Sequence, residues 1–107
     1  MDSNEIILNN IKDSTCESIQ KLSLDIYGKY DLDKSIIWMT EEFGEVVAAI
    51  RKQKGKEDIS GEFGDLLAWI FAIANNLEIK VSDAIEISFK KEVNRQINTY
   101  GRLKYKK

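Results

Sequence analysis

The chain has 107 residues, enough for one small domain and too few for two independent hydrophobic cores. Hydrophobic residues make up 43% and charged residues 32%, which is typical of a folded domain and argues against disorder. The formal net charge of -2 argues against binding to nucleic acid polymers or to a membrane surface through bulk charge.

The cysteine and histidine content limits the cellular compartment that we expect and the side chains available for acid–base and metal chemistry. The single Cys16 cannot form an intrachain disulfide, and no signal-peptide pattern opens the chain, so we predict a reducing, cytoplasmic setting. The apolar run 66–74 is much shorter than the roughly 20 residues that span a bilayer, so no membrane span is predicted. Because histidine is absent, acid–base and metal chemistry has to use carboxylates, amines, hydroxyls or the one thiol.

The absence of proline and the helical spacing of apolar residues predict an all-α fold. Residues 1–13 show no clear period and are expected to form a loose arm or an extra helical turn. Ser14 and Glu17 match a capping box, which predicts a first helix over about residues 15–27.

A helical hairpin is predicted in the middle of the chain. Asp33 is expected to cap a second helix that ends near residue 52, before a polar turn containing the helix-ending Gly55. A third helix is predicted over residues 57–76.

A fourth helix is expected to be capped by Ser82 and to end near Tyr100, leaving residues 102–107 as a solvated or frayed tail. Residues 1–107 are therefore expected to form one all-α domain with a four-helix core.

The second predicted helix carries an acidic face. Glu41, Glu42 and Glu45 have no basic neighbour before Arg51, although like charges three or four residues apart repel by a few tenths of a kcal/mol. A separate apolar arc is expected to face the core and consists of Met39, Phe43, Val46, Val47 and Ile50.

The third predicted helix repeats this pattern with Glu62 and Asp65, directly before the apolar run. A charge in such a segment is costly to bury unless a cation compensates it. Glu42 and Glu45 lie as far before the turn as Glu62 and Asp65 lie after it, so an antiparallel hairpin brings both pairs to one level. Helices about 8 to 10 Å apart would let the two pairs share an ion.

Four oxygen donors without histidine or thiolate favour Mg²⁺, with Mn²⁺ as a substitute, over Zn²⁺, Cu²⁺ or a di-iron centre. Mg²⁺ in proteins usually retains waters and binds substrate phosphates, so the pattern indicates phosphate chemistry. The alternative is a solvated acidic face on one helix and dipole-stabilising acids in the first turns of the next.

Three segments resemble the signature of the MazG-type all-α nucleoside triphosphate pyrophosphohydrolases, and the resemblance covers roughly residues 36–98. They are residues 38–46 with Glu-Glu-x-x-Glu, residues 62–67 with Glu-x-x-Asp, and the break at residues 76–79. The resemblance implies a four-helix core that assembles into a homodimer or homotetramer. It also implies hydrolysis of a nucleoside triphosphate to monophosphate and pyrophosphate by water.

The implied Mg²⁺ ligands are Glu42, Glu45, Glu62 and Asp65. Glu41 is implied as an outer partner of the metal centre or as the base that deprotonates the water.

Further candidates concern substrate binding. Lys91, Asn94 and Asn98, with Arg95 at the edge of the same face, match phosphate-binding positions of the family, or they form a polar outer face. Trp38 lies one turn before Glu42 and is a candidate for stacking on a base, with core packing as the alternative. Trp69 is expected in the core or at a subunit interface.

Two alternatives to a triphosphate pyrophosphohydrolase stay open at this point. One is a non-catalytic helical module that binds nucleotides or a partner protein, and the other is a structural helical oligomer. Within the enzyme class, phosphoribosyl-ATP pyrophosphohydrolase belongs to the same superfamily. The third predicted helix is apolar on nearly every side, which argues against a monomer under each of these hypotheses.

Overall fold

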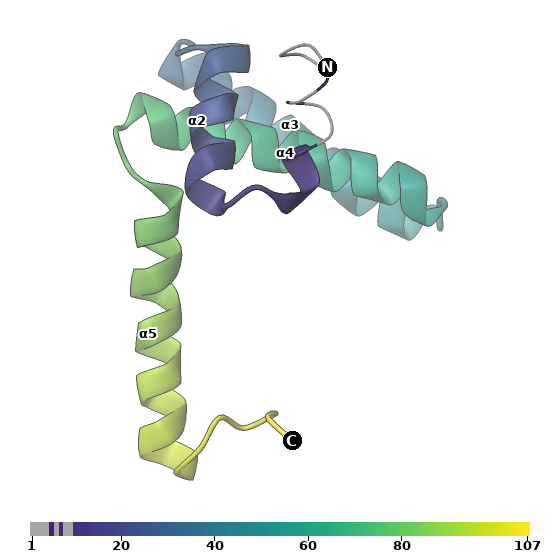
Figure 1. Ribbon diagram of the computed structural model, residues 1–107. Coiled ribbons are helices and arrows are strands. Elements are labelled where there is room, and N and C mark those ends of the chain that lie inside the picture. The colour runs from purple at the N-terminus through teal and green to yellow at the C-terminus, as the bar shows by residue number, and fades with distance from the viewer. Residues whose placement is uncertain (1–4, 6, 8–9) are drawn as a thin grey trace.

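The computed structural model describes residues 5, 7 and 10–107, and it is helical with short connections throughout this part. The predictions for residues 1–4, 6, 8 and 9 lie outside the described residues. A short 3-10 helix, η1, precedes four α-helices, which confirms the predicted all-α class (Figure 1). The elements are η1 (Ile11–Asp13), α2 (Cys16–Tyr27), α3 (Leu32–Arg51), α4 (Lys56–Asn76) and α5 (Val81–Tyr100).

Helices α3 and α4 form the antiparallel hairpin that the sequence predicts (Figure 1). The amide of Lys54 donates to the carbonyl oxygen of Ala49 at 3.1 Å, and Gln53 adopts a left-handed conformation with φ 54°. This is the Schellman pattern, with glutamine at the position where glycine is usual. The expected helix-ending role of Gly55 is therefore wrong, because Gly55 is the extended N-cap of α4.

The first predicted helix cap is displaced by one residue. The Thr15 side chain accepts a hydrogen bond from the amide of Ser18, whereas the Ser14 hydroxyl donates to the carbonyl of Asn10. The predicted Ser14 capping box is wrong because Ser14 is bound to the preceding turn.

The caps of two later helices also differ from the prediction. Asp31, two residues before the predicted Asp33, caps α3 by accepting from the amide of Lys34. Helix α5 begins after Lys80 without a side-chain cap, so Ser82 lies inside its first turn. The local sequence therefore predicts where these helices lie more accurately than it predicts their first residues.

Gln20 of α2 is a buried side chain that joins three elements. Its Nε2 donates to Asn75 Oδ1 at 3.1 Å and to the carbonyl of Ile79 at 2.8 Å. Its Oε1 accepts from the amide of Val81 at 2.8 Å. These bonds fix the turn after α4 and the direction in which α5 begins.

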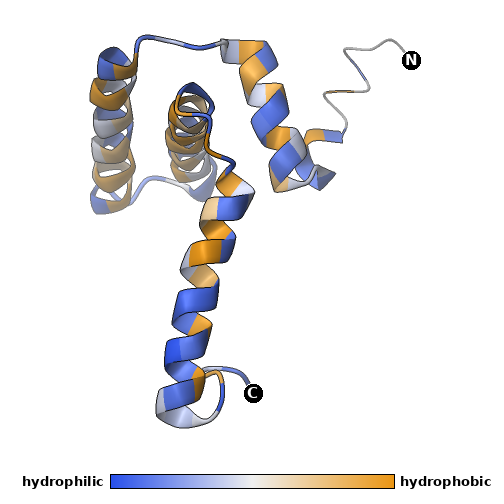
Figure 2. Ribbon diagram, turned by 90° about the vertical axis from the view of Figure 1, so that its left-hand side faces the viewer, coloured by the Kyte–Doolittle hydropathy of each residue, from blue (hydrophilic) through white to orange (hydrophobic). Residues whose placement is uncertain are grey.

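Helix α5 projects away from the body formed by α2, α3 and α4 (Figures 1 and 2). None of its residues is buried against the described part of the chain, and Ile87 and Phe89 are 72% and 67% exposed. Figure 2 shows hydrophobic segments alternating with hydrophilic ones along this helix. The basic tail turns back toward α5, where the amide of Lys104 donates to Gln96 Oε1 at 2.9 Å. The residues of the tail are exposed, and this contact ties its backbone to α5.

The predicted core stripe of α3 is only partly buried. Val46 is 5% exposed, whereas Phe43 is 59% and Ile50 is 51% exposed. Our prediction that all these side chains face the core is therefore wrong for this single chain, because no described helix covers that side of α3. Small residues fill much of the actual core, including Ala49, Ala72 and Ala74.

No helix in the described part of the chain is both long and apolar enough to cross a membrane. The cytoplasmic setting stays a prediction.

Candidate metal centre and adjoining cavities

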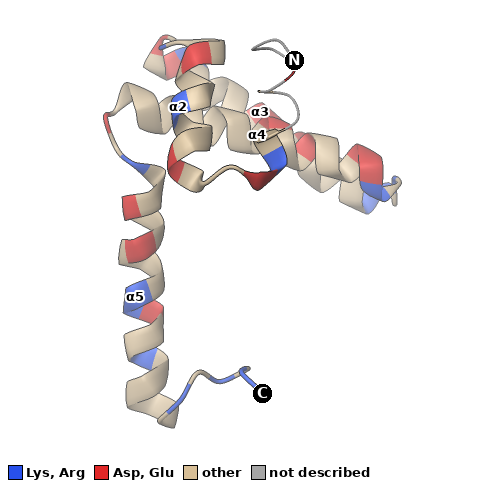
Figure 3. Ribbon diagram, in the orientation of Figure 1, with Lys and Arg blue, Asp and Glu red and all other residues tan. Residues whose placement is uncertain are grey.

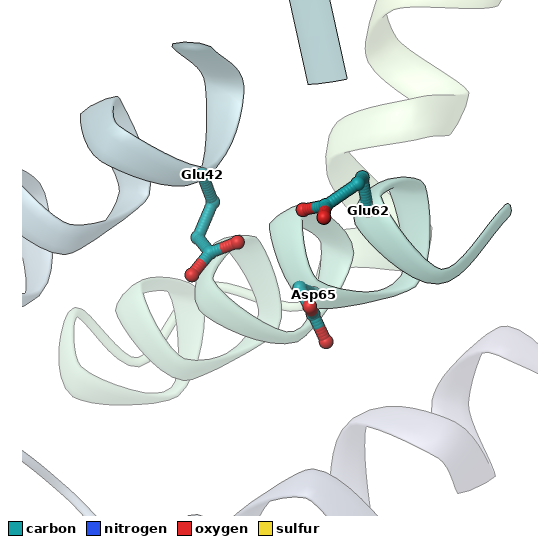
Figure 4. Close-up of side chains that lie close together, drawn as sticks. All are labelled: Glu42, Glu62 and Asp65. Carbon is teal, nitrogen blue, oxygen red and sulfur yellow. The ribbon is translucent and has the colours of Figure 1, made fainter. Parts of the chain in front are cut away.

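Three of the four predicted metal ligands come together between α3 and α4. Glu42 of α3 and Glu62 and Asp65 of α4 each offer a carboxylate oxygen, and these oxygens lie within 4.8 Å of one another. Figure 4 shows Glu42 and Glu62 directed toward the space between their helices, with Asp65 beside them. This acidic cluster has the dimensions needed to hold one cation between the two helices.

The hairpin explains why these residues meet. Glu42 lies as many residues before the turn as Asp65 lies after it, and the same is true of Glu45 and Glu62. Both pairs are centred on the turn between residues 53 and 54. Residues equally far from the turn face each other when two helices run antiparallel, because each residue advances both helices by about 1.5 Å. The same midpoint applies to Trp38 and Trp69, one turn farther from the tip.

Glu45 lies beside the acidic cluster and influences two of its members. Burial, followed by the negative charges of Glu45 and Asp65, raises the pKa of Glu42. A hydrogen bond with the Glu45 side chain, then burial and nearby negative charge, raises the pKa of Glu62. Carboxylates this close repel one another, which is the electrostatic reason that their proximity raises both pKa values.

The donor set of the cluster fits a hard divalent cation. Within the described part of the chain, Glu42 Oε2 and Glu62 Oε2 are buried and have no hydrogen-bond partner. Leaving a buried acceptor unsatisfied costs about 1 to 3 kcal/mol, and more for a charged group. Carboxylate oxygens are the ligands that Mg²⁺ and Mn²⁺ prefer, so a cation of this type would satisfy both orphaned atoms.

A positive charge at the tip of the hairpin acts on the cluster. Lys54 partly opposes the upward shift in the pKa of Glu62. Figure 3 shows acidic positions along the hairpin and basic ones at its turn. Glu41, in contrast, has an exposed side chain and lies outside the group of converging acids.

Three aromatic rings gather next to the acids. Trp38 and Trp69 have ring centroids 5.0 Å apart, and the ring of Tyr30 lies 6.2 Å from Trp38 and 6.0 Å from Trp69. The Tyr30 and Trp38 planes meet at 86°, which is an edge-to-face contact. We call these three residues the aromatic trio.

Two cavities lie beside the acidic cluster and the aromatic trio. The acidic cavity, of about 260 Å³, is lined by Tyr27, Glu42, Asp65, Ala68, Trp69 and Ala72. The aromatic cavity, of about 360 Å³, is lined by Tyr30, Trp38, Glu42 and Trp69. Glu42 and Trp69 line both cavities, so the two cavities adjoin at these side chains.

Sequence reasoning singled out Trp38 but missed other residues of these cavities. Trp69, which we expected in the core or at an interface, lines both cavities, and its position four residues after Asp65 was an available signal. Tyr27 is the last residue of α2, and Tyr30 lies in the loop that follows it. The periodicity of the sequence does not predict the path of this loop.

The four candidates on α5 are not brought to the acidic cluster within one chain. Lys91, Asn94, Arg95 and Asn98 are exposed on the projecting helix (Figure 1). The Arg95 guanidinium pairs with Glu92 on the same helix at 2.5 Å.

Comparisons with known proteins agree with the geometry. Residues 32–99, more than half of the chain, match the model of the MazG nucleotide pyrophosphohydrolase domain. The crystal structure of the Bacillus-conserved MazG protein, a nucleotide pyrophosphohydrolase, superposes with a TM-score of 0.67 at 26% sequence identity. The match covers 73% of this chain and 88% of that one. A search of curated proteins found no match.

Replacing Glu62 with glutamine tests whether the cluster holds a metal. The metal-free variant should be at least as stable as the wild type, because the substitution removes one of several repelling charges. Wild type should gain thermal stability on addition of Mg²⁺, and Glu62→Gln should lose this gain, because a ligand stabilises only the state that binds it. Melting temperatures with EDTA and with a Mg²⁺ series measure both effects. An equal Mg²⁺ response in the two proteins would contradict the metal site.

The raised pKa values predict how the stability of the metal-free protein depends on pH. Because Glu42 and Glu62 bind protons more tightly when folded than at their unfolded value of about 4.5, stability should fall as pH rises above that value. Urea unfolding in EDTA at pH 5.5 and 7.5 should therefore give the higher free energy of unfolding at pH 5.5. The double variant Glu42→Gln/Glu62→Gln should show a smaller difference, and an unchanged difference would contradict the assignment.

Proposed function

This chain belongs to the MazG nucleotide pyrophosphohydrolase family, which confirms the resemblance seen in the sequence, and we propose that it hydrolyses a nucleoside triphosphate with the aid of Mg²⁺. The observation that supports the metal requirement is the convergence of Glu42, Glu62 and Asp65, with two buried carboxylate oxygens that lack partners. The products are a nucleoside monophosphate and pyrophosphate.

Glu42, Glu62 and Asp65 would hold the cation, with Glu45 as a fourth ligand or as the base. Mn²⁺ is expected to substitute for Mg²⁺, since both accept carboxylate ligands. A bound divalent cation would neutralise negative charge on the phosphates and make a nearby water more acidic.

The reaction needs an acceptor for one proton. The oxygen of water forms a bond to phosphorus, the phosphorus–oxygen bond of the α–β bridge breaks, and the water proton passes to a carboxylate. Glu45 acts on the pKa of both Glu42 and Glu62, whereas Glu41 is not among the groups that shift them, so Glu45 is better placed for this role.

The aromatic trio would bind the base. Trp38, our original candidate, contacts Trp69 and lines the aromatic cavity together with Tyr30. Stacking of one base on an aromatic ring is worth about 1 to 3 kcal/mol and tolerates different bases. With the phosphates at Glu42 and Asp65, the base would reach this cavity. The base and sugar preferred, and phosphoribosyl-ATP as a substrate, are questions for a substrate panel.

Substitution of the acidic cluster tests the activity. Pyrophosphate release should fall roughly 100-fold in Glu42→Gln and Asp65→Asn, the scale seen when a group that stabilises the transition state is removed. Glu57→Gln is a matched control on α4, because Glu57 is acidic and exposed but lies outside the cluster. Comparing kcat of Glu45→Gln and Glu41→Gln separates the two candidates for the base.

The assay should include a panel of triphosphates and phosphoribosyl-ATP, each with Mg²⁺ and with Mn²⁺. Tight nucleotide binding without turnover on the whole panel would favour a non-catalytic binding module.

The exposed apolar residues of α5 support an oligomer. Ile87 and Phe89 are largely exposed, and Phe43 and Ile50 leave a second uncovered apolar surface on α3. Monomeric proteins rarely expose large contiguous apolar patches, so a second copy of the chain is expected to cover part of this area. Such an assembly would also allow Lys91, Asn94, Arg95 and Asn98 of one subunit to bind phosphates held by another.

Ile87→Glu tests this assembly. Wild type should sediment as a dimer or tetramer, and Ile87→Glu should shift it toward monomer, because the substitution places a charge in the apolar contact. Lys90→Glu is the control, since it adds an acid to α5 without removing an apolar side chain.

If the site spans two subunits, mixed Glu62→Gln and Lys91→Ala subunits should recover activity that neither variant has. A fully active wild-type monomer would contradict both ideas.

A further inference from the structure

The loop between α2 and α3 is held from a distant part of the chain. Asn76, the last residue of α4, donates a hydrogen bond from Nδ2 to the carbonyl oxygen of Tyr30. The loop leaves α2 at Gly28, which has a positive φ of 67°, and enters α3 at its N-cap Asp31. Asn76 therefore fixes the middle of a short segment whose ends are already set by helix caps.

Of the three aromatic rings, only that of Tyr30 has its backbone in this loop, so the position of the ring depends on the loop. Trp38 and Trp69 lie within α3 and α4, so helix packing alone fixes their backbones. Tyr30 lies outside any helix, yet its ring contacts both tryptophans and lines the aromatic cavity. The backbone position of Tyr30 therefore determines where its ring stands in the wall of the aromatic cavity.

A second link joins the same two segments. The ammonium of Lys29 lies 4.0 Å from a carboxylate oxygen of Glu78, and both side chains are mainly exposed. Exposed pairs of this kind contribute about 0 to 1 kcal/mol and are screened by salt. A hydrogen bond from the neutral amide of Asn76 is not screened by salt in this way, so it should persist at ionic strengths that weaken the ion pair.

We propose that Asn76 is a positioning residue that holds Tyr30 as a wall of the aromatic cavity and thereby sets the affinity for the base of the substrate. The identity of the ligand rests on the proposed function, whereas the restraint on Tyr30 does not. Asn76 acts on base binding through Tyr30 and takes no part in the chemistry at the phosphates.

The neighbouring Asn75 provides a matched control. Its side chain bonds to Gln20, with Oδ1 accepting from Nε2 and Nδ2 donating to the carbonyl of Gln20 at 3.2 Å. Asn75 thus holds α2 against the end of α4, and in the described structure its side-chain hydrogen bonds go to Gln20 and not to the loop. Substituting either asparagine with aspartate removes a donor amide at the same end of α4, but only Asn76→Asp should disturb the cavity.

Tryptophan fluorescence tests the restraint without any substrate. Because Trp38 and Trp69 are the two tryptophans of the chain, its tryptophan emission comes entirely from the aromatic trio. Asn76→Asp should increase quenching of this emission by acrylamide, since Tyr30 no longer shields the rings, whereas Asn75→Asp should not. Asn76→Ala is a second variant that removes the donor without adding charge, and urea unfolding confirms that each variant is folded.

Kinetics test the consequence for the base. For a triphosphate that the wild type cleaves, Asn76→Asp should raise KM about three- to tenfold, the scale of one lost hydrogen bond, with kcat within about twofold. Tyr30→Ala should raise KM similarly. The double variant should be no worse than Tyr30→Ala alone, because residues that act through one contact are not additive.

The outcomes separate this inference from the proposed function. Unchanged quenching in both folded Asn76 variants would overturn the restraint, whether or not the protein has activity. An equal rise in KM for Asn75→Asp, or additive effects of Asn76→Asp and Tyr30→Ala, would overturn the positioning role. Absence of turnover in the wild type on every triphosphate would instead count against the proposed function, and the quenching result would still decide the restraint.

Discussion

The crowding of carboxylates between α3 and α4 is the constraint on which the rest of this structure depends. Glu42, Glu62 and Asp65 approach closely although they repel, and two of their oxygens are buried without a partner. Apolar packing holds the helices together despite this repulsion, with small core residues such as Ala49 and Ala72 allowing a close approach. A cation placed between the helices would turn a destabilising arrangement into a binding site, so folding prepares the site at some cost in stability.

The aromatic trio extends this site by using the same hairpin geometry. Because Trp38 and Trp69 lie one turn beyond the acids and at one level, a polar surface and an aromatic one adjoin along a single helix interface. Glu42 borders both cavities. A nucleotide has the matching division into anionic phosphates and a flat base, which relates the shape of the site to the activity of the family.

Helix α5 and one side of α3 are not covered by any other described part of the chain. The few fully buried apolar residues are small, whereas large ones such as Phe43, Ile87 and Phe89 stay exposed. The Gln20 network nevertheless fixes where α5 starts, through its bond to the amide of Val81. A helix with a defined direction and an exposed apolar surface is suited to pack against another copy.

The sequence by itself determined the helices, the hairpin and the common level of the acids, because backbone geometry and the distance from one turn fix all three. It placed several helix starts wrongly, as at Ser14 and Asp33, because capping depends on which of several nearby polar side chains reaches the free amides. Tertiary structure alone decided that Tyr30 joins the tryptophans and that α5 projects away from the acidic cluster. Hydrogen bonds between residues far apart in the chain accompany both features, from Asn76 to Tyr30 and from Gln20 to Asn75, Ile79 and Val81, and no local pattern encodes them.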